Sequence, residues 1–284
     1  MQIDSIRTFS VQYKEHGKGK ILMVILFFLV SFLSCIVGAI CGIGGGVVIK
    51  PVLDMLHLGS VSTINFLSGC TVLSMSCYSV GKALINKDSK VDMVTGTPLA
   101  IGAAVGGLAG KELFSIVKSL FANAEMVGGV QAVALGIITV GTLVYTICKG
   151  NIATHRISNK IFCVVVGLLL GIMSSFLGIG GGPINLVVLG YCFSMDSKTA
   201  AANSLYIILF SQLTSFISTL ITGVPEFEIL ALTVMVAGGI GGGIVGRALN
   251  KKMDNRAVDK LFICLMTVII GICVYNAVRS FGGM

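Results

Sequence analysis

The sequence predicts an all-α polytopic membrane protein, and three observations lead to that prediction. The chain has 284 residues, of which 55% are hydrophobic and only 11% are charged. A soluble domain usually has about 25% charged residues, so this chain has too few polar side chains to cover a soluble core. Its mean hydropathy is +0.98. Apolar runs of about 18 or more residues, the length that spans a bilayer as a helix, recur from Ile21 nearly to the C-terminus.

The chain also predicts an internal duplication. The pentapeptide GIGGG occurs at 42–46 and again at 178–182, so that Gly42 and Gly178 are separated by 136 residues. At the same separation GAAVGGLAGK (102–111) matches GGIGGGIVGR (238–247). We therefore divide the chain into a polar N-terminal segment (1–20), a first transmembrane repeat (21–149), a linker loop (150–156) and a second transmembrane repeat (157–284). We do not expect the N-terminal segment to be a removable signal peptide, because further membrane segments follow it.

Each repeat contains five apolar pieces in the same order. A long run enters the glycine block, a short piece follows it, then come a full-length span, a glycine-rich span and a final span. Glycines three and four residues apart allow helix backbones to approach closely in a membrane. About eight to ten membrane segments result, and we expect the two repeats to be inverted, as in many transporters with broken helices. The expected bounds are 21–41, 47–57, 63–85, 94–113 and 127–148, then 157–177, 183–193, 199–222, 229–249 and 258–279.

The two glycine blocks predict discontinuous helices. In hydrocarbon every backbone N–H and C=O needs a partner, so a break is tolerated only inside the protein or beside a polar cavity. Glycine permits positive φ and lets a ligand approach the backbone. The helices that resume at Val47 and Pro183 point unpaired amides and positive dipole ends into the breaks. Two such helix starts would form an anion site; in the alternative, the blocks are packing kinks without a ligand.

Polar residues at the start of the following spans are candidates to complete the site. Thr63 and Thr199, like Ser68 and Ser204, are matched at the 136-residue separation. Such hydroxyls either donate to a bound oxyanion or bond to carbonyls of their own helix. The substrate-binding candidates are Gly44, Gly45, Gly46, Gly180, Gly181, Gly182, Ser68, Asn203, Ser204, Thr63 and Thr199.

Two charges lie inside an apolar segment just after the first block. Intramembrane charges are costly and indicate function by default, so Lys50 and Asp54 are candidates for coupling or charge compensation. Their spacing of four residues also fits a mutually neutralised pair. Their counterparts in the second repeat are Leu186 and Gly190, so an ionic role would belong to one half alone.

The composition argues against several other functions. The net charge of +8 lies in end segments and loops, which favours contact with anionic lipid headgroups rather than nucleic acid. None of the nine cysteines forms a CxxC pair, and no histidine stands at metal-ligand spacing, so we expect no metal or cofactor. The expected full-length spans contain neither a histidine nor a pair of acids, and His57, at the end of the short piece 47–57, is expected to be a loop residue; this argues against an intramembrane enzyme. The GIGGG blocks lack the lysine of a nucleotide-binding loop.

Several longer motifs resemble the sulfite exporter (TauE/SafE) family of membrane permeases. They are GAICGIGGGVVIKPVL, FLGIGGGPINLVVL, TAAANSLYIIL and VAGGIGGGIVGRALNKKMDNRAVDKLFICLMTVIIGI. The resemblance covers nearly the whole chain after Lys20 and implies a cytoplasmic (inner) membrane protein that moves sulfite, thiosulfate or sulfonates. It implies that Gly44–Gly46, Pro51 and Gly180–Gly182 form the broken-helix motif, with Ser68 and Ser204 at the small-hydroxyl positions. The first half reads FLSGCTV instead of the commoner Thr-Ser pairing, which leaves the identity of the anion open.

The predicted function is secondary transport of a small sulfur-containing oxyanion by alternating access. The anion would bind near the membrane midplane between the two GIGGG breaks, and a proton or ion gradient would supply the coupling. The alternative is a passive anion channel with the same duplicated pore; an intramembrane enzyme is less favoured. The direction of transport and the topology stay open at this point.

Overall fold

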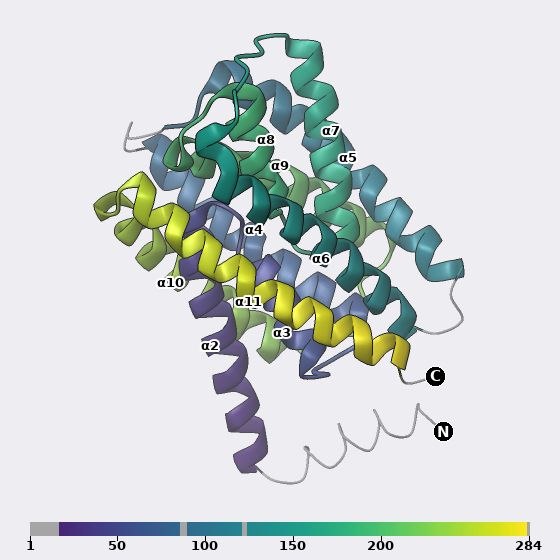
Figure 1. Cartoon of the computed structure of the whole chain (residues 1–284). Helices are drawn as coiled ribbons and strands as arrows, with labels where there is room; N and C mark the ends of the chain where they lie inside the picture. The colour runs from purple at the N-terminus through teal and green to yellow at the C-terminus, as the bar shows by residue number, and fades with distance from the viewer. Residues whose placement is uncertain (1–16, 86–89, 121–123, 283–284) are drawn as a thin grey trace.

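The computed structural model of the protein describes residues 17–85, 90–120 and 124–282. They form ten α-helices and one short 3-10 helix, η1 (Lys149–Asn151), and no strand, so the predicted all-α class is confirmed for them (Figure 1). Of the predicted polar segment 1–20, only the first turn of α2 is described. The helices are α2 (Gly17–Cys41), α3 (Gly46–Met55), α4 (Val61–Ile85), α5 (Met93–Leu120), α6 (Ala124–Cys148), α7 (Lys160–Leu177), α8 (Pro183–Phe193), α9 (Ser197–Thr222), α10 (Ile229–Lys252) and α11 (Asn255–Gly282).

The described residues contain seven helices that are long and apolar enough to cross a membrane: α2, α5, α6, α7, α9, α10 and α11. The remaining three are the short helices α3 and α8 and the 25-residue α4, which is rich in serine and threonine. Many large apolar side chains on the spanning helices face outward, among them Ile137 and Ile161. Such an apolar exterior suits lipid contact, and the chain is a multi-pass membrane protein.

Local sequence signals fix several helix starts. Asn159 accepts hydrogen bonds from the amides of Ile161 and Phe162 at the start of α7, as an N-cap residue does. Asp196 caps α9 in the same way by accepting from the Thr199 amide at 2.7 Å. Burial alone would raise the pKa of Asp196, but the hydrogen bonds from Thr199, the charge of Lys90 and a hydrogen bond from Asn255 together outweigh it and lower that pKa below its usual value.

The chain turns back on itself at each glycine block. A β-carbon at Gly38, near the end of α2, would lie only 2.6 Å from the backbone of Gly44 and Gly45, so α3 returns beside the helix it follows. At the second block, the amide of His155, in the segment before α7, donates to the carbonyl of Tyr191 near the end of α8 at 2.8 Å. Each pair, α2–α3 and α7–α8, is therefore a re-entrant hairpin.

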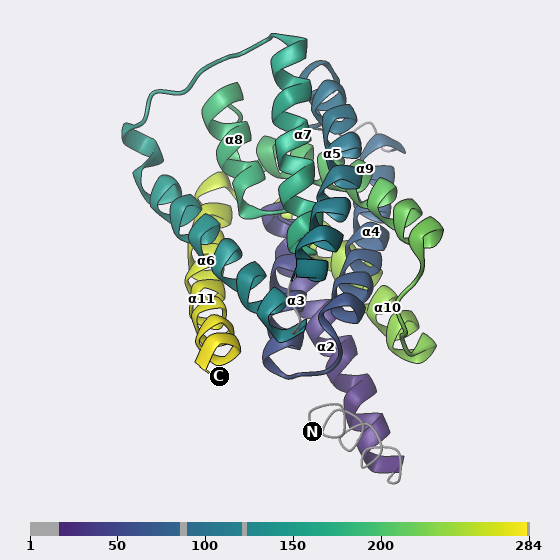
Figure 2. The ribbon, with the colours of Figure 1, turned by 90° about the vertical axis from the view of Figure 1, so that its right-hand side faces the viewer.

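The helix ends meet at two opposite faces of the bundle. At one, which we call the basic face, α4, α6, α8 and α10 end and α5, α7, α9 and α11 begin; there Asn203 accepts from the Asp92 amide at 3.1 Å. At the other, which we call the opposite face, α3, α5, α9 and α11 end and α2, α4, α6 and α10 begin; there Thr63 donates to the Glu226 carbonyl at 2.8 Å. In both views α8 lies in the upper half of the molecule and α3 in the lower half (Figures 1 and 2). The hairpin α2–α3 thus enters from the opposite face and α7–α8 from the basic face.

Glycines hold two helix pairs in close contact. A β-carbon at Gly106 of α5 would collide with the Leu168 carbonyl of α7, and one at Gly242 of α10 would collide with the Phe32 carbonyl of α2. The two contacts are related by the same 136-residue separation. Close backbone approach at small residues replaces the hydrophobic force that is missing between helices in lipid.

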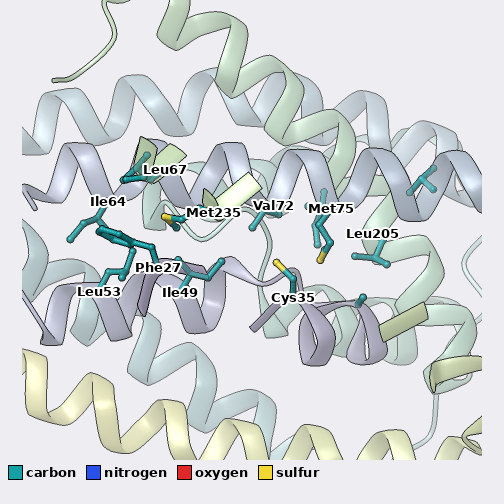
Figure 3. Packing of buried hydrophobic residues seen from close by; sticks show 14 of the residues in the cluster. Phe27, Cys35, Ile49, Leu53, Ile64, Leu67, Val72, Met75, Leu205 and Met235 are labelled. Carbon is teal, nitrogen blue, oxygen red and sulfur yellow. The ribbon is translucent and has the colours of Figure 1, made fainter. Parts of the chain in front are cut away.

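The remaining packing joins the short helices to this frame. Helices α6 and α11 lie side by side in both views and enclose α3 and α8 from one side (Figures 1 and 2). One of three clusters of buried apolar side chains joins α2, α3, α4, α5, α9 and α10 (Figure 3). Its members include Phe27, Ile49, Leu53, Ile64, Leu67, Val72, Met75, Leu205 and Met235.

We expect Gly106→Val to destabilise the protein strongly. The added side chain has to displace the backbone of α7, and overpacking of this kind costs about 1–3 kcal/mol or more. Thermal unfolding of the purified protein in detergent measures the effect. The matched control is Gly141→Ala on α6, where a β-carbon meets nothing within 4 Å; equal stability of the two variants would contradict the assigned contact.

Candidate substrate site

Both helix breaks have the same backbone conformation at matching positions. Gly42 and Gly44 have φ values of 75° and 76°, and Gly178 and Gly180 have values of 64° and 73°. These angles lie in the left-handed region, which glycine adopts without steric cost. The first and third residues of each GIGGG block are thus the points at which the α-helix is interrupted.

The two breaks contact each other in the interior. A β-carbon at Gly46 would collide with the carbonyl oxygen of Ile179 in the other break. Reciprocally, a β-carbon at Gly181 would lie 3.1 Å from the carbonyl oxygen of Ile43. Ile43 and Ile179 are completely buried. The backbones of the two breaks therefore approach each other so closely that any side chain at Gly46 would separate them.

Two aliphatic side chains flank the contact between the breaks. Val72 of α4 lies 3.3 Å from the β-carbon position of Gly44 and 2.7 Å from that of Gly180. Ile208 of α9 lies 3.6 Å from the β-carbon position of Gly44. Val72 and Ile208 are themselves separated by 136 residues and are both inaccessible to solvent. The breaks are closed in this conformation.

Buried polar atoms without a hydrogen-bond partner lie beside the breaks. Ser68 is fully buried, its Oγ has no partner, and it lies 2.9 Å from the β-carbon position of Gly46. Asn185, in the first turn of α8, is 2% exposed and donates from Nδ2 to Ser204 Oγ at 3.2 Å. The other amide atom of Asn185, Oδ1, has no partner. An unpartnered buried polar group costs about 1–3 kcal/mol, which indicates a ligand or a change of conformation that satisfies it.

This chemistry suits a small oxyanion. The helix starts of α3 and α8 direct backbone amides and the positive ends of their dipoles toward the breaks. The hydroxyls of Ser68 and Ser204 add donors from α4 and α9. Within the described residues, no group of three or more His, Cys, Asp or Glu side chains is placed to hold a metal ion.

Lys50 and Asp54 form an ion pair. Their Nζ and Oδ2 atoms are 2.9 Å apart, with Lys50 3% exposed and Asp54 19% exposed. Both lie on α3, and the carbonyl of Pro51 on the same helix accepts a hydrogen bond from Asn276 of α11 at 2.9 Å. Asp54 therefore neutralises the charge of the buried Lys50 on the helix that follows the first break.

Three of the predicted residues do not reach the breaks. Asn203 is buried but bonds to the backbone of Lys90, Asp92 and Thr199, and so ties the segment before α5 to α9. Thr63 bonds to Glu226 at the opposite face. Thr199 lies in the first turn of α9 at the basic face, one helix turn from the Asn203 side chain that bonds to its carbonyl.

The structure adds residues that the sequence did not single out. Asn65 lies against the second break, where its side chain occupies the position of a β-carbon at Gly178, and its Oδ1 has no partner. Gln131 of α6 donates to the carbonyl of Phe176 just before that break, and its Oε1 is also unpartnered. The sequence signal that could have found both residues is a carboxamide side chain inside an apolar span, because such a group is costly in lipid unless it is paired.

Re-entrant hairpins whose glycine-rich tips meet inside a multi-pass bundle define a membrane transporter of the broken-helix kind. The chain belongs to the sulfite exporter TauE/SafE family, whose model matches residues 27–272.

The curated relatives that the chain resembles are named as probable membrane transporters. Probable membrane transporter protein YunE of Bacillus subtilis (strain 168) is 22% identical over 279 residues, which cover 90% of this chain and 99% of that protein. Probable membrane transporter protein MJ0441 of Methanocaldococcus jannaschii is 24% identical over 214 residues, covering 70% of this chain and 73% of that protein. No solved structure matches the chain.

We expect Gly180→Ala to destabilise the protein while Gly182→Ala leaves its stability nearly unchanged. Alanine at Gly180 needs a positive φ, which costs about 1–2 kcal/mol, and its β-carbon would press on Val72. Gly182 has an extended backbone with φ of −150°, and its nearest neighbour to a β-carbon is 3.6 Å away. Thermal unfolding of the two variants compares these positions directly. An equal loss of stability would show that the left-handed conformation is not what the break requires.

We expect Asp54→Asn to cost about 3–5 kcal/mol of stability, because it leaves the buried Lys50 charge unpaired. The double variant Lys50→Met/Asp54→Leu removes both charges and should recover most of that loss. Denaturation in detergent measures the difference. If Asp54→Asn is as stable as the original protein, the ion pair does not neutralise Lys50 in the folded state.

Proposed function

We propose that this protein is a secondary transporter that carries a small sulfur-containing oxyanion, of the sulfite, thiosulfate or organosulfonate class, across the cytoplasmic membrane. Membership of the TauE/SafE family supports transport in general. The observation that favours an anion at the breaks is the unpartnered Ser68 Oγ beside the start of α3.

The proposed binding residues are the glycines of the two breaks together with hydroxyl and amide groups beside them. Backbone amides of Gly44–Gly46 and Gly180–Gly182 would donate to the anion, with Ser68 and Ser204 adding hydroxyl donors. Asn185 would release Ser204 and donate to the anion in its place. Because the breaks are closed on each other, the anion would bind only after they separate.

The same arrangement supports alternating access as the mechanism. The two hairpins enter from opposite faces, and α4 and α9 run in opposite directions, which is the geometry of inverted repeats. Rocking of one repeat against the other would open the contact between the breaks to one face at a time. Val72 and Ile208 would then act as the hydrophobic barrier on either side of the anion.

The test is binding and flux with the purified protein. Sulfite, thiosulfate, sulfate and a short sulfonate are titrated by calorimetry, and uptake of the anion that binds is followed in proteoliposomes. Saturable flux that an imposed proton or sodium gradient accelerates supports the proposal. Flux that never saturates and follows only the electrochemical gradient would instead identify a passive channel. No binding of any of the four anions would remove the proposed substrate class.

We expect Ser68→Ala to raise thermal stability but to weaken anion binding by about tenfold. The change removes a buried hydroxyl without a partner, and it also removes one donor to a charged ligand, worth about 1.5–3 kcal/mol. The matched control is Ser76→Ala, which removes another buried, unpartnered hydroxyl from the same helix, one turn beyond Val72. The two variants should gain similar stability, and only Ser68→Ala should lose affinity. Equal affinities in the two variants would place the anion elsewhere.

A further inference from the structure

Two pockets approach the breaks from the two faces of the bundle. One, of about 340 Å³, lies among the end of α4, the start of α9 and the end of α10, and so belongs to the basic face. The other, of about 530 Å³, lies among the start of α4, the end of α9 and the second half of α5, and belongs to the opposite face. We call them the basic-face vestibule and the opposite-face vestibule.

The two vestibules are built from matching positions. Three pairs of lining residues are separated by 136 positions. They are Ala201 of α9 with Asn65 of α4, Ser215 of α9 with Ser79 of α4, and Arg247 of α10 with Lys111 of α5. Since each member of a pair lines a different vestibule, the same construction occurs once at each face.

Each vestibule is lined by a residue that packs against the first glycine of a break. In the basic-face vestibule, Ala201 lies so close to Gly42 that a β-carbon there would collide with it. In the opposite-face vestibule, Asn65 lies against Gly178 in the same way, and Gly178 itself lines the pocket. An anion that moves inward from either face therefore arrives at one of the two breaks.

Each vestibule contains a cation that donates a hydrogen bond to an uncharged oxygen. Arg247 donates from Nη1 to the Ser79 carbonyl at 2.5 Å, and Lys111 donates to the hydroxyl of Thr219. Neither cation takes part in the ion pairs Lys50–Asp54 and Lys149–Asp259, and the acid that interacts electrostatically with Lys111 is Glu112, the next residue of α5. A guanidinium has five N–H donors and an ammonium three, so both cations keep donors for a ligand.

We propose that Arg247 and Lys111 are equivalent anion-receiving residues, each of which binds the oxyanion in its vestibule before or after the anion passes the breaks. This inference rests on the proposed function, because the anion is the one that the breaks would transport. A cation in a half-buried cleft focuses the field and raises the local concentration of anions. A hydrogen bond to a neutral carbonyl or hydroxyl is given up for an oxyanion at little cost, since the bond to the charged ligand is the stronger one.

The charges that line the two vestibules indicate which face of the bundle is cytoplasmic. The basic-face vestibule is also lined by Lys90, Lys198 and Lys251, and no acidic residue is among its described lining. The opposite-face vestibule contains Lys118 and the acid Glu112. Of the remaining described arginines and lysines, those at the basic face include Lys82, Lys149, Arg156, Lys160, Lys252, Arg256 and Lys260. Cytoplasmic loops carry the excess of Lys and Arg, so the basic-face vestibule opens to the cytoplasm.

The first arm of the test measures transport by proteoliposomes that contain the full chain. Arg247→Gln and Lys111→Gln should each raise the concentration for half-maximal thiosulfate flux by about tenfold, the effect of one lost charge-assisted hydrogen bond. Arg247→Lys and Lys111→Arg keep the charge and should recover most of the affinity. Lys260→Gln removes an exposed cation of the basic face outside the vestibule and should behave as the original protein. Unchanged flux in both glutamine variants would overturn the proposal.

The second arm measures access and does not depend on transport. Arg247→Cys and Lys111→Cys are treated with a membrane-impermeant anionic methanethiosulfonate in intact cells and in inside-out vesicles, with the unsubstituted protein as background for its native cysteines. Cys at 247 should react only in inside-out vesicles and Cys at 111 only in cells. Reaction of both from the same side would overturn the two-vestibule arrangement, and reversed sides would overturn the face assignment. If the original protein neither binds nor transports an anion, both the proposed function and the proposed anion binding by Arg247 and Lys111 are wrong. The labelling result still shows whether the two vestibules open to opposite sides of the membrane.

Discussion

A backbone amide or carbonyl without a partner costs several kcal/mol in hydrocarbon, and this constraint governs the whole arrangement. Two helices of this chain stop at buried glycines, so their free backbone groups have to be shielded from lipid. The structure meets this requirement by placing the two breaks against each other, with the Ile179 carbonyl at Gly46 and the Ile43 carbonyl near Gly181. The other helices surround that contact.

The surrounding helices can approach the helices of the two hairpins closely because the residues at their contacts are small. Glycines of α5 and α10 lie on carbonyls of α7 and α2, which are the helices that lead into the breaks. The glycine-rich helices thus fix the position of each hairpin and also carry Lys111 and Arg247. Under the proposed function, packing and substrate access would depend on the same two helices, so a substitution that shifts α10 is expected to move a break and a vestibule cation together.

Much of the fold followed from the sequence. The hydropathy pattern predicted the helices, and the observed bounds of α8 coincide with the predicted 183–193. Helix α5 is longer than predicted, because its charged second half, KELFSIVKSL, is helical but not a continuous apolar run. The glycine blocks predicted helix interruptions because four glycines in five residues weaken a helix inside an otherwise hydrophobic stretch.

The side-chain assignments were less accessible from the sequence. Ser68 and Asn203 both lie near the start of an inner helix, yet Ser68 faces the breaks whereas Asn203 bonds to the segment before α5. Which way each side chain faces depends on how its helix is rotated about its own axis. A sequence with polar residues on several sides of a helix does not show that rotation. Lys111 and Arg247 served in the sequence only as a mark of the duplication, because the pockets beside them form between distant segments.

The matched pairs of residues bear on the energy of the resting protein. A chain made of two identical inverted halves would have inward-open and outward-open states of equal free energy, because exchanging the two halves converts one state into the other. Here the halves differ at the inner walls, where Asn65 faces one break and Ala201 the other. The ion pair of Lys50 and Asp54 likewise has only Leu186 and Gly190 as its counterparts. Under alternating access, sequence divergence between the halves would therefore set the orientation in which the empty protein waits for its substrate.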